Sequence, residues 1–322
     1  MKPSISLALA VAAVIAVSAN LPAGEVPQVD LTQWKAPDIK TVGDDAFGKL
    51  VKYGHALMTD TANLIGPSAT DPAMRYSGNN LTCQNCHLKA GTQAYAMPLV
   101  GVWGQFPQYR GREGEIGTLE ERINGCMDRS MNGRRLPLDG REMKAYLAYM
   151  KWLSNGVADG AKLVGNGTMR IAEPKRAADP KRGGDVFEQT CVVCHGKDGQ
   201  GKRAASGNGY QFPPLWGADS YNDGAGMTRV LTAAAFVRHN MPLGTTFDAP
   251  VVSDEDAYDV AAYINSMARP AKADLERDFP NKLQKPVDTP YGPYADSLPA
   301  EQHKYGPFDP IRAKVRELQA AK

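Results

Sequence analysis

Five cysteines carry most of the chemical information in this sequence of 322 residues. Four of them lie in two copies of the pattern C-x-x-C-H, at residues 83–87 and 191–195. In this pattern the two thiols add to the vinyl groups of a haem, and the histidine coordinates the iron. A zinc site or a thiol-exchange pair is the alternative, but neither needs a histidine directly after the second cysteine. The sequence therefore predicts two covalently bound c-type haems. Their expected attachment residues and proximal ligands are Cys83, Cys86, Cys191, Cys194, His87 and His195.

A short apolar segment follows a single lysine at the N-terminus. Lys2, the apolar run Ile5–Val17 and the small residues near Ala19 and Ala23 are typical of a secretory signal peptide. The run is too short to span a bilayer, and no later stretch is apolar for long enough, so we expect no membrane span. Covalent haem attachment takes place outside the bacterial cytoplasm. A signal peptide over residues 1–23 therefore predicts a periplasmic protein.

The charge of the chain is nearly balanced. Its 37 basic and 35 acidic residues give a formal net charge of +2, and charged residues make up 22% of the sequence. This balance gives no reason to expect a nucleic acid partner. The mature chain of about 300 residues is long enough for two ordinary domains.

Similar features surround the two haem motifs, which start 108 residues apart at Cys83 and Cys191. An apolar-periodic stretch over residues 47–64 precedes the first motif, and a shorter expected helix over residues 179–187 precedes the second. A second helix is expected to close each half. Each half therefore has a helix on either side of its haem motif.

The closing helices have clear start and stop signals. In the first half, Asp139 and Glu142 form a capping-box pattern, and Gly156 stops the helix. In the second half, Ser253 opens the helix and Pro270 closes it. An opening helix, a haem-attachment turn, a ligand loop and a closing helix make up a class I cytochrome c domain. We therefore predict a mainly α fold with two such domains in tandem.

Composition suggests the remaining boundaries. Residues 157–178 are rich in Gly, Ala and Lys and are read as a linker. The segment from residue 270 to residue 310 holds eight prolines, which predicts an extended arm. Its aromatic residues, such as Tyr291 and Phe308, favour packing over the domains rather than disorder. The expected parts are a signal peptide (1–23), an N-terminal catalytic domain (24–156), a linker (157–178), a C-terminal cytochrome domain (179–270) and an arm (271–322).

The second haem needs a distal ligand, and Met241 is the leading candidate. It lies in a loop, 46 residues after His195, and a proline follows it, which is the usual arrangement in cytochromes c. His/Met ligation suits a transfer haem of higher potential. His239, Met227 and Met267 are its rivals.

In the first domain the corresponding region carries Cys126, the cysteine left over by the two motifs. A capping box at Thr118 and Glu121 predicts a helix from Leu119 onward, with Arg122 and Cys126 on one face. A buried, inert cysteine is the ordinary alternative. A distal thiolate is favoured because the haem lacks a sixth ligand, and because a spare thiol is an oxidation hazard in the periplasm. Met97, Met127 and Met131 remain as rivals.

The arginines near this cysteine suggest an anionic ligand. Between residues 110 and 135 there are six arginines and five acids, so a mixed-charge surface is the ordinary interpretation. Arg122 shares the face of Cys126, and Arg112 ends an aromatic, glycine-rich loop. Planar guanidinium groups suit tetrahedral oxyanions through paired hydrogen bonds. We therefore include Arg112 and Arg122 among the candidate substrate-binding residues.

Several runs of sequence resemble the dihaem thiosulfate dehydrogenases. These runs are GVWGQFPQYRGR (101–112), TLEERINGCMDRSMNG (118–133), the segment 141–154, and the tail from YGPY at 291 to GPF at 306. The resemblance spans nearly the whole mature chain. It implies oxidation of two thiosulfates to tetrathionate, with electrons passing through both haems to a small periplasmic c-type cytochrome. It also implies that Cys126 is the essential distal ligand and that Arg112 and Arg122 bind substrate. Some members carry a lysine directly before the second-haem methionine that can itself coordinate iron, whereas this chain has Asn240.

Other functions fit parts of the same pattern. A tetrathionate reductase would run the reaction backwards, and the haem potentials would distinguish it. A SoxA-like subunit also uses a cysteine-ligated haem but acts on a carrier protein with a partner subunit. A dihaem electron carrier without a substrate would tolerate methionine at position 126.

Overall fold

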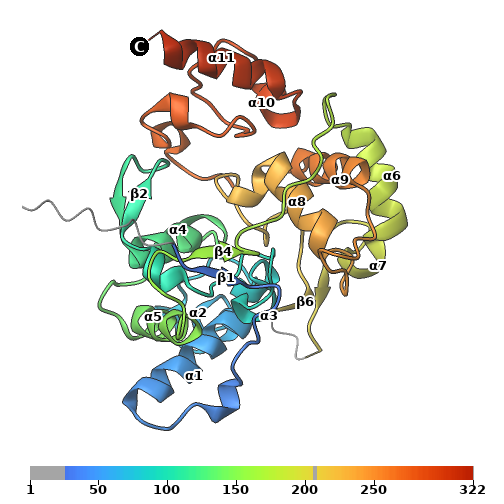
Figure 1. The fold of residues 1–322 in the computed structure, drawn as a ribbon. Helices are drawn as coiled ribbons and strands as arrows, with labels where there is room; N and C mark the ends of the chain where they lie inside the picture. The colour runs from blue at the N-terminus through green and yellow to red at the C-terminus, as the bar shows by residue number, and fades with distance from the viewer. Residues whose placement is uncertain (1–25, 206–208, 322) are drawn as a thin grey trace, which may run out of the picture.

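The computed structural model describes residues 26–205 and 209–321, so the expected signal peptide lies outside the described residues. The chain forms two helical lobes, with a C-terminal segment lying above them in Figure 1. No described helix is both long and apolar enough to cross a bilayer. The lobes correspond to the two expected domains.

The first lobe is built around two helices that cross. Its elements are β1 (Gln28–Asp30), α1 (Ala46–Thr59), α2 (Thr61–Ile65), α3 (Leu88–Gly91), β2 (Gln108–Arg110), β3 (Glu115–Gly117), α4 (Leu119–Arg129), α5 (Arg141–Leu153) and β4 (Lys162–Val164). Asp45 caps α1 by accepting a hydrogen bond from the backbone N–H of Gly48. The crossing of α1 and α5 requires a glycine, because a Cβ on Gly54 would lie 2.1 Å from the carbonyl oxygen of Ala145.

The second lobe repeats this construction. Its elements are α6 (Pro180–Thr190), α7 (Val192–His195), β5 (Lys202–Arg203), β6 (Tyr210–Phe212), α8 (Val230–Asn240) and α9 (Asp254–Ser266). Helix α6 crosses α9 at Gly183, where a Cβ would lie 2.0 Å from the carbonyl oxygen of Asp259. Asp179 caps α6, and Ser253 caps α9 as the sequence predicts. Both lobes therefore place a glycine where the opening helix meets the closing helix.

The described residues form three small two-stranded sheets. β1 pairs with β4 in parallel, with Gln28 opposite Lys162. β2 and β3 form an antiparallel hairpin with Gln108 opposite Gly117, and β5 pairs with β6. Because β4 lies within the expected linker 157–178 and pairs with β1, the beginning of that linker is part of the first lobe.

The closing helix of the first lobe begins differently from the prediction. Its N-cap is Gly140 and not Asp139, because the chain turns before the helix and the N–H of Gly140 bonds to the carbonyl of Pro137. Glu142 does not reach back to the cap. It is buried and accepts a hydrogen bond from the hydroxyl of Tyr53 at 3.0 Å. The capping box predicted at Thr118 and Glu121 of α4 is present.

The expected extended arm is only partly extended. It ends in two helices, α10 (Ala300–Tyr305) and α11 (Asp309–Ala320). Prolines lie only at their starts, Pro299 at the N-cap of α10 and Pro310 in the first turn of α11, where a proline is compatible with a helix. Phe308 and Ile311 are each 1% exposed and belong to the hydrophobic core of the second lobe. The arm therefore packs on the domains, as its aromatic residues predict.

Candidate functional site

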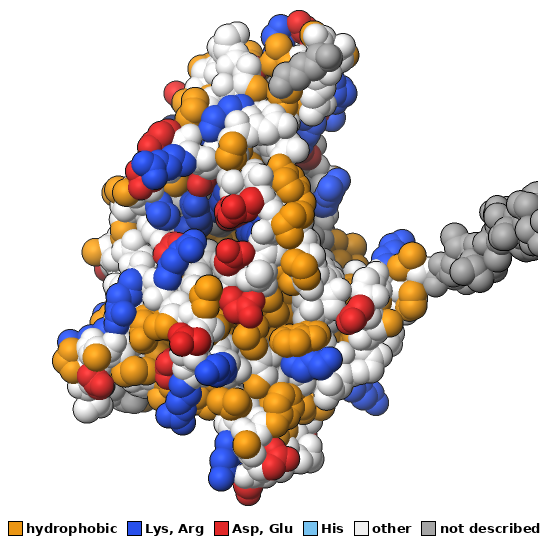
Figure 2. All heavy atoms as spheres, turned by 90° about the vertical axis from the view of Figure 1, so that its left-hand side faces the viewer, with side chains coloured by type: hydrophobic (Ala, Val, Ile, Leu, Met, Phe, Trp, Pro, Cys, Tyr) orange, Lys and Arg blue, Asp and Glu red, His pale blue; other side chains and the backbone are white. Residues whose placement is uncertain are grey.

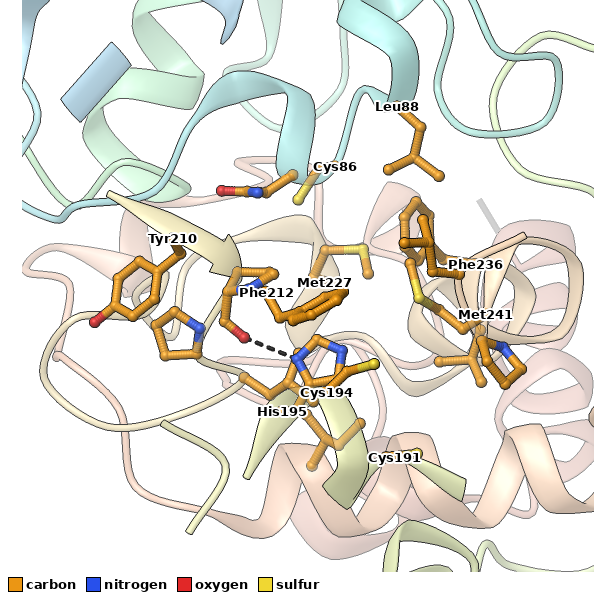
Figure 3. A pocket seen from close by; sticks show the side chains of 18 of the residues that line it. Cys86, Leu88, Cys191, Cys194, His195, Tyr210, Phe212, Met227, Phe236 and Met241 are labelled. Carbon is orange, nitrogen blue, oxygen red and sulfur yellow. Dashed lines mark hydrogen bonds between the residues drawn. The ribbon is translucent and has the colours of Figure 1, made fainter. Parts of the chain in front are cut away.

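A cavity of about 350 Å³ lies in the second lobe, where the second haem motif faces the α8–α9 side. Figure 3 shows its main lining residues: Cys191, Cys194 and His195 at the bottom, Met227 and Met241 above them, and Cys86 and Leu88 of the first lobe closing the top. Most of the remaining lining is apolar, including Phe236, Val260 and Ile264. A large apolar cavity with one histidine and two thiols at its base is suited to a haem.

The histidine of this cavity is oriented by the backbone. The Nδ1 atom of His195 lies 2.8 Å from the carbonyl oxygen of Pro213, so Nδ1–H donates and Nε2 is left free. Burial lowers the pKa of His195, which favours the neutral imidazole that coordinates a metal.

Two thioethers line the second cavity, so the distal ligand is not decided by geometry alone. Met241 directly follows the last residue of α8, and Met227 lies on the preceding loop. His239 is 7% exposed, its Nδ1 bonds to the carbonyl of Ala235 within its own helix, and it is not among the described residues that line the cavity. Its place outside the lining disfavours the histidine and leaves Met241 as the candidate supported by both its position and the cavity.

A second cavity of about 300 Å³ lies in the first lobe. It is lined by Cys83, Cys86 and His87 of the first motif and by Cys126 of α4. The Nδ1 atom of His87 lies 2.5 Å from the carbonyl oxygen of Met97, so the other side of the imidazole faces the cavity and Cys126. The rival ligands also line this cavity: Met97, Met127 and Met131.

The two cavities share a wall. Five residues line both of them: Leu81, Thr82, Cys86, Tyr221 and Met227. One of the five, Cys86, belongs to the first haem motif. Groups bound in the two cavities would therefore be separated by a single layer of side chains.

Cys126 differs from Cys83 and Cys86 in the first cavity, because its thiol pKa is lowered whereas theirs are raised. The guanidinium of Arg122, one helical turn away, donates a hydrogen bond from Nη1 to its Sγ at 2.8 Å. Burial acts to raise the pKa of Cys126, but Arg122 and the imidazole of His87 outweigh it and lower the pKa to about 6. The thiolate in turn raises the pKa of Arg122. The site therefore favours an ionised sulfur paired with an arginine and facing the proximal histidine.

The arginines predicted to bind substrate occupy different places. Arg122 lines the first cavity, and so does Arg110, which the sequence analysis did not single out. Arg110 donates from Nε to Glu113 at 3.1 Å. Arg112 instead directs Nη1 to the carbonyl oxygen of Gly224 at 2.9 Å, and its guanidinium lies over the ring of Phe279. The structure therefore brings Arg122 to Cys126 but turns Arg112 toward the second lobe and the arm.

The surroundings of Arg112 are rich in cations. Arg129 donates to the same carbonyl of Gly224 and forms an ion pair with Asp278 of the arm at 2.7 Å. Lys285, 7% exposed, lies over the rings of Tyr291 and Tyr294. Figure 2 shows this face of the molecule with basic and acidic side chains interspersed and several basic ones set back in its upper part. The face is mixed in sign, as the residue count predicts.

The residues present fit two c-type haems. Each cavity has two free thiols at the spacing of the attachment motif and a histidine whose Nδ1 bonds to a backbone carbonyl. Each also has a sulfur on another element, Cys126 in the first and Met241 in the second. The residues that would hold the two groups are thus all in place.

Comparison with known proteins agrees with this arrangement. The profile of the SoxA/TsdA cytochrome c domain matches residues 74–158, and the profile of cytochrome c matches residues 180–268. The thiosulfate dehydrogenase of Allochromatium vinosum is 41% identical over 266 residues, which cover 81% of this chain and 93% of that protein. The chain belongs to the thiosulfate dehydrogenase family.

Other members of the thiosulfate dehydrogenase family show similar agreement. The thiosulfate dehydrogenase of Stutzerimonas stutzeri is 41% identical over 237 residues, covering 74% of this chain and 73% of its own. A solved structure of thiosulfate dehydrogenase (TsdBA) from Marichromatium purpuratum superposes with a TM-score of 0.68 at 36% identity. The match covers 76% of this chain, which spans about half (51%) of that longer chain. As a family member, this chain is an oxidoreductase with two tandem cytochrome c domains and two covalently bound haem c groups.

One feature of the site was not predicted from the sequence. Arg110 and Arg112 are two residues apart, and only the end of β2 at Arg110 decides which of them faces the cavity. Hairpin ends carry no reliable sequence signal, because a change of one residue in register moves the side chains to the other face. Arg110 is therefore a further candidate beside Arg122.

Proposed function

We propose that this protein oxidises thiosulfate to tetrathionate at the first haem cavity in the periplasm. The observation that carries the proposal is the contact of 2.8 Å between Arg122 and Cys126 beside His87. A plain electron carrier has no need for a buried thiolate paired with an arginine. The family relationship supports the substrate class.

The arginines would bind the dianionic substrate. Two thiosulfates repel each other as they approach, and cationic side chains in a water-poor cavity offset that repulsion. Arg122 and Arg110 line the cavity, whereas Arg112 lies between β2 and β3 and donates to the carbonyl of Gly224. A guanidinium can give two parallel hydrogen bonds to a sulfonate group. We propose that Arg122 and Arg110 bind the substrate, and that Arg112, which the family resemblance implies, joins them by leaving the carbonyl of Gly224.

The thiolate of Cys126 would make the first sulfur–sulfur bond. It joins the sulfane sulfur of one thiosulfate to give a Cys–S–S–SO₃⁻ adduct, and two electrons leave. The second thiosulfate then attacks the sulfane sulfur, which releases tetrathionate and restores the thiolate. When bound, the haems supply the acceptor for the two electrons. Arg122 would stabilise the thiolate both before the first step and after the second.

The second lobe would be the exit for electrons. His195 and Met241 would hold the second haem, and the shared wall between the cavities keeps the two haems close. His/Met ligation gives a potential suited to passing electrons onward. We propose a small periplasmic c-type cytochrome as the acceptor.

The decisive experiment adds thiosulfate to the purified holoprotein and follows reduction of ferricyanide or of an added cytochrome c. Tetrathionate formed in a one-to-two ratio with thiosulfate consumed is the expected result. Reduction of tetrathionate without thiosulfate oxidation would mean that the reductase direction dominates. Absence of both activities in a protein with two haems would return it to the electron-carrier interpretation.

A further inference from the structure

The loop that positions the first haem's histidine is also bonded to the segment that carries the second haem's methionine. Asn240, 2% exposed, is the last residue of α8 and directly precedes Met241. Its Oδ1 accepts a hydrogen bond from Nε2 of Gln93 at 2.8 Å, and its Nδ2 donates to the carbonyl of Tyr95 at 3.2 Å. Both partners belong to the first lobe. The side chain of Asn240 is thus a bond between the lobes.

The first-lobe loop itself is held firmly. The backbone N–H groups of Tyr95 and Met97 donate to the carbonyls of Gly165 and Gly167, at 2.6 and 2.8 Å. Tyr95 and Met97 both have positive φ values, 58° and 52°. Residues other than glycine adopt such backbone angles only when their surroundings require it. The loop therefore has one well-defined conformation that several contacts maintain.

The two ends of this connection reach the two haem sites. At one end the carbonyl of Met97 accepts the hydrogen bond from Nδ1 of His87 at 2.5 Å. At the other end Asn240 is joined to Met241, whose own N–H bonds to the carbonyl of Val237 at 3.0 Å. The contacts of Asn240 with the first lobe and the contact of His87 with the carbonyl of Met97 all lie within residues 93–97.

We propose that Asn240 is a positioning residue that couples the ligand geometry of the two haem sites through the loop 93–97. It holds Met241 over the second cavity and at the same time steadies the carbonyl that fixes His87. The proposal rests on the ligand assignments of the proposed function, but it concerns the resting protein and needs no substrate. A substitution of Asn240 in the second lobe would then change the reduction potential of the first haem.

The expected direction follows from the contact at His87. A hydrogen bond from Nδ1–H to a carbonyl makes the imidazole a stronger donor to its metal, which stabilises the oxidised form. Loosening the loop 93–97 weakens that bond, so the first haem becomes easier to reduce. At the second haem, a less firmly held Met241 gives a smaller fraction of molecules with methionine on iron.

The test uses purified holoprotein without thiosulfate and three variants. Asn240→Leu keeps the branched side-chain shape and removes the amide, Gln93→Met removes one of the inter-lobe bonds, and His239→Gln is the matched control. His239 is the neighbour of Asn240 on α8, and its Nδ1 bonds to the carbonyl of Ala235 in that same helix. Redox titration follows each haem by its visible band, and the near-infrared methionine-to-iron band reports ligation of the second haem.

Asn240→Leu is expected to raise the ratio of reduced to oxidised first haem about tenfold at the wild-type midpoint potential, and to weaken the methionine band. Gln93→Met should change the first-haem ratio and the methionine band in the same directions but by less. His239→Gln should leave both measurements as in the wild type. An unchanged first haem in both Asn240→Leu and Gln93→Met would overturn the coupling. If Asn240→Leu fails to retain two haems, Gln93→Met decides. Thiosulfate oxidation by the wild type is assayed separately, so failure of the proposed function is distinguishable.

Discussion

A buried thiol is normally a weak acid, and Cys126 is an exception because of its neighbours. Removal from water raises a thiol's pKa, yet Arg122 and His87 bring the pKa of Cys126 to about 6. A thiolate is both the nucleophile and the metal ligand form of cysteine. The same residue can therefore serve as a haem ligand and as the reacting sulfur, and the two roles make different predictions.

Replacing Cys126 separates the two roles. If Cys126 is the reacting sulfur, Cys126→Met and Cys126→Gly should both keep two covalent haems and lose nearly all thiosulfate oxidation. Methionine can coordinate iron but cannot form the sulfur–sulfur bond, so a ligand role alone predicts measurable turnover with an upshifted first haem. Intact mass checks the haems, and tetrathionate formation measures activity. Full activity in Cys126→Met would reduce the residue to a replaceable ligand.

The arginines can be ranked by single substitutions to glutamine. Arg122→Gln should lower kcat/KM for thiosulfate. The expected loss corresponds to about 1.5–3 kcal/mol of transition-state stabilisation, the usual cost of a lost charge-assisted hydrogen bond. Arg112→Gln is predicted to lower kcat/KM similarly, and Arg110→Gln tests the additional cavity residue. Steady-state kinetics with cytochrome c as acceptor gives the three values. Arg135→Gln is a matched control, because Arg135 is 60% exposed and paired with Asp128. Wild-type kinetics in Arg112→Gln would mean that its bond to Gly224 is its whole role.

At this scale the sequence is most informative where a motif fixes the chemistry. The two haem c groups predicted from the motifs are confirmed by the two cytochrome c domains, and the attachment cysteines and proximal histidines stay predictions from the five-residue motifs. The pairing of Arg122 with Cys126 follows from their spacing of four on a helix. Asn240 could not be predicted to bond to Gln93, because that contact joins residues 147 positions apart.

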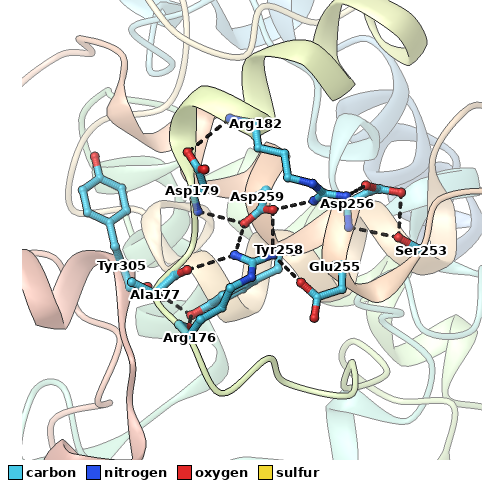
Figure 4. Close-up of polar contacts among 10 residues, drawn as sticks. All are labelled: Arg176, Ala177, Asp179, Arg182, Ser253, Glu255, Asp256, Tyr258, Asp259 and Tyr305. Atoms are coloured by element: carbon cyan, nitrogen blue, oxygen red, sulfur yellow. Dashed lines mark hydrogen bonds and ion pairs between the residues drawn. The ribbon is translucent and has the colours of Figure 1, made fainter.

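At the scale of elements, the α6–α9 pair is held by one carboxylate. Asp259 is 0% exposed, and Figure 4 shows it receiving Arg176, Arg182 and the backbone N–H of Asp179. Arg176 donates two hydrogen bonds, at 2.7 and 2.8 Å, and Arg182 donates one at 2.5 Å. Burial opposes ionisation of this carboxyl, but these donors keep the pKa of Asp259 below its usual value of 3.8. The segment before α6 is thereby tied to the closing helix.

The stability of the second lobe should depend on pH through Asp259. Because its pKa is lower in the folded state, the unfolded state binds more protons below about pH 3.8, so stability falls on acidification there. Asp259→Asn should remove this component and cost about 1.5–3 kcal/mol at neutral pH, since both arginines are partly exposed and keep Glu255 and Asp256 as partners. Urea unfolding followed by circular dichroism at several pH values measures both effects.

The matched control for Asp259 is Glu255→Gln. Glu255 also pairs with Arg176, but its side chain is 53% exposed, so its loss should cost less than about 1 kcal/mol. If the two variants lose the same free energy of unfolding, burial of the carboxylate does not determine how much each ion pair stabilises the lobe.

Element prediction from sequence was accurate where caps and periodicity agree. Helices α4 and α9 begin at the predicted caps Thr118 and Ser253, and α6 begins within one residue of the start predicted at 179. The cap at Asp139 was wrong because a turn bonded from Gly140 to Pro137 competes with it. The single expected stretch over residues 47–64 divides into α1 and α2 at Asp60, a break that apolar periodicity does not reveal.

At the scale of the whole molecule, the second lobe contributes walls to the first cavity. Tyr221 and Met227 line both cavities, and Asn222 of the same segment donates to the carbonyl of Asp128 at 2.9 Å. Nearby, the carboxylate of Asp219 accepts from the backbone and side chain of Asn80. The sequence predicts two domains, but it cannot predict that their cavities share a wall, because that depends on contacts between residues far apart in the chain.

The arm contacts the β2–β3 hairpin, which carries Arg110 and Arg112. The N–H of Phe279 donates to the carbonyl of Arg112 at 2.7 Å, and the hydroxyl of Tyr109 donates to Gln284 at 2.9 Å. Asp278, with its side chain 8% exposed, accepts from Arg129 and from the hydroxyl of Tyr291, at 2.7 and 2.6 Å. One arm carboxylate thus joins α4, which also carries Cys126, to the arm that supports the β2–β3 hairpin.

Asp278→Asn should therefore weaken substrate binding without disturbing the haems. Its amide keeps the shape but leaves the charge of Arg129 without a partner, so the arm and the hairpin lose part of their fixed geometry. We expect KM for thiosulfate to rise several-fold, kcat to change little, and both haem spectra to stay as in the wild type, because Asp278 contacts no proposed ligand. Asp274→Asn in the same arm is the control, since its pair with Arg277 is long, 3.9 Å, and exposed. A wild-type KM in Asp278→Asn would limit the arm to a stabilising role, whereas loss of the first haem's spectrum would place its effect on the fold of the first lobe.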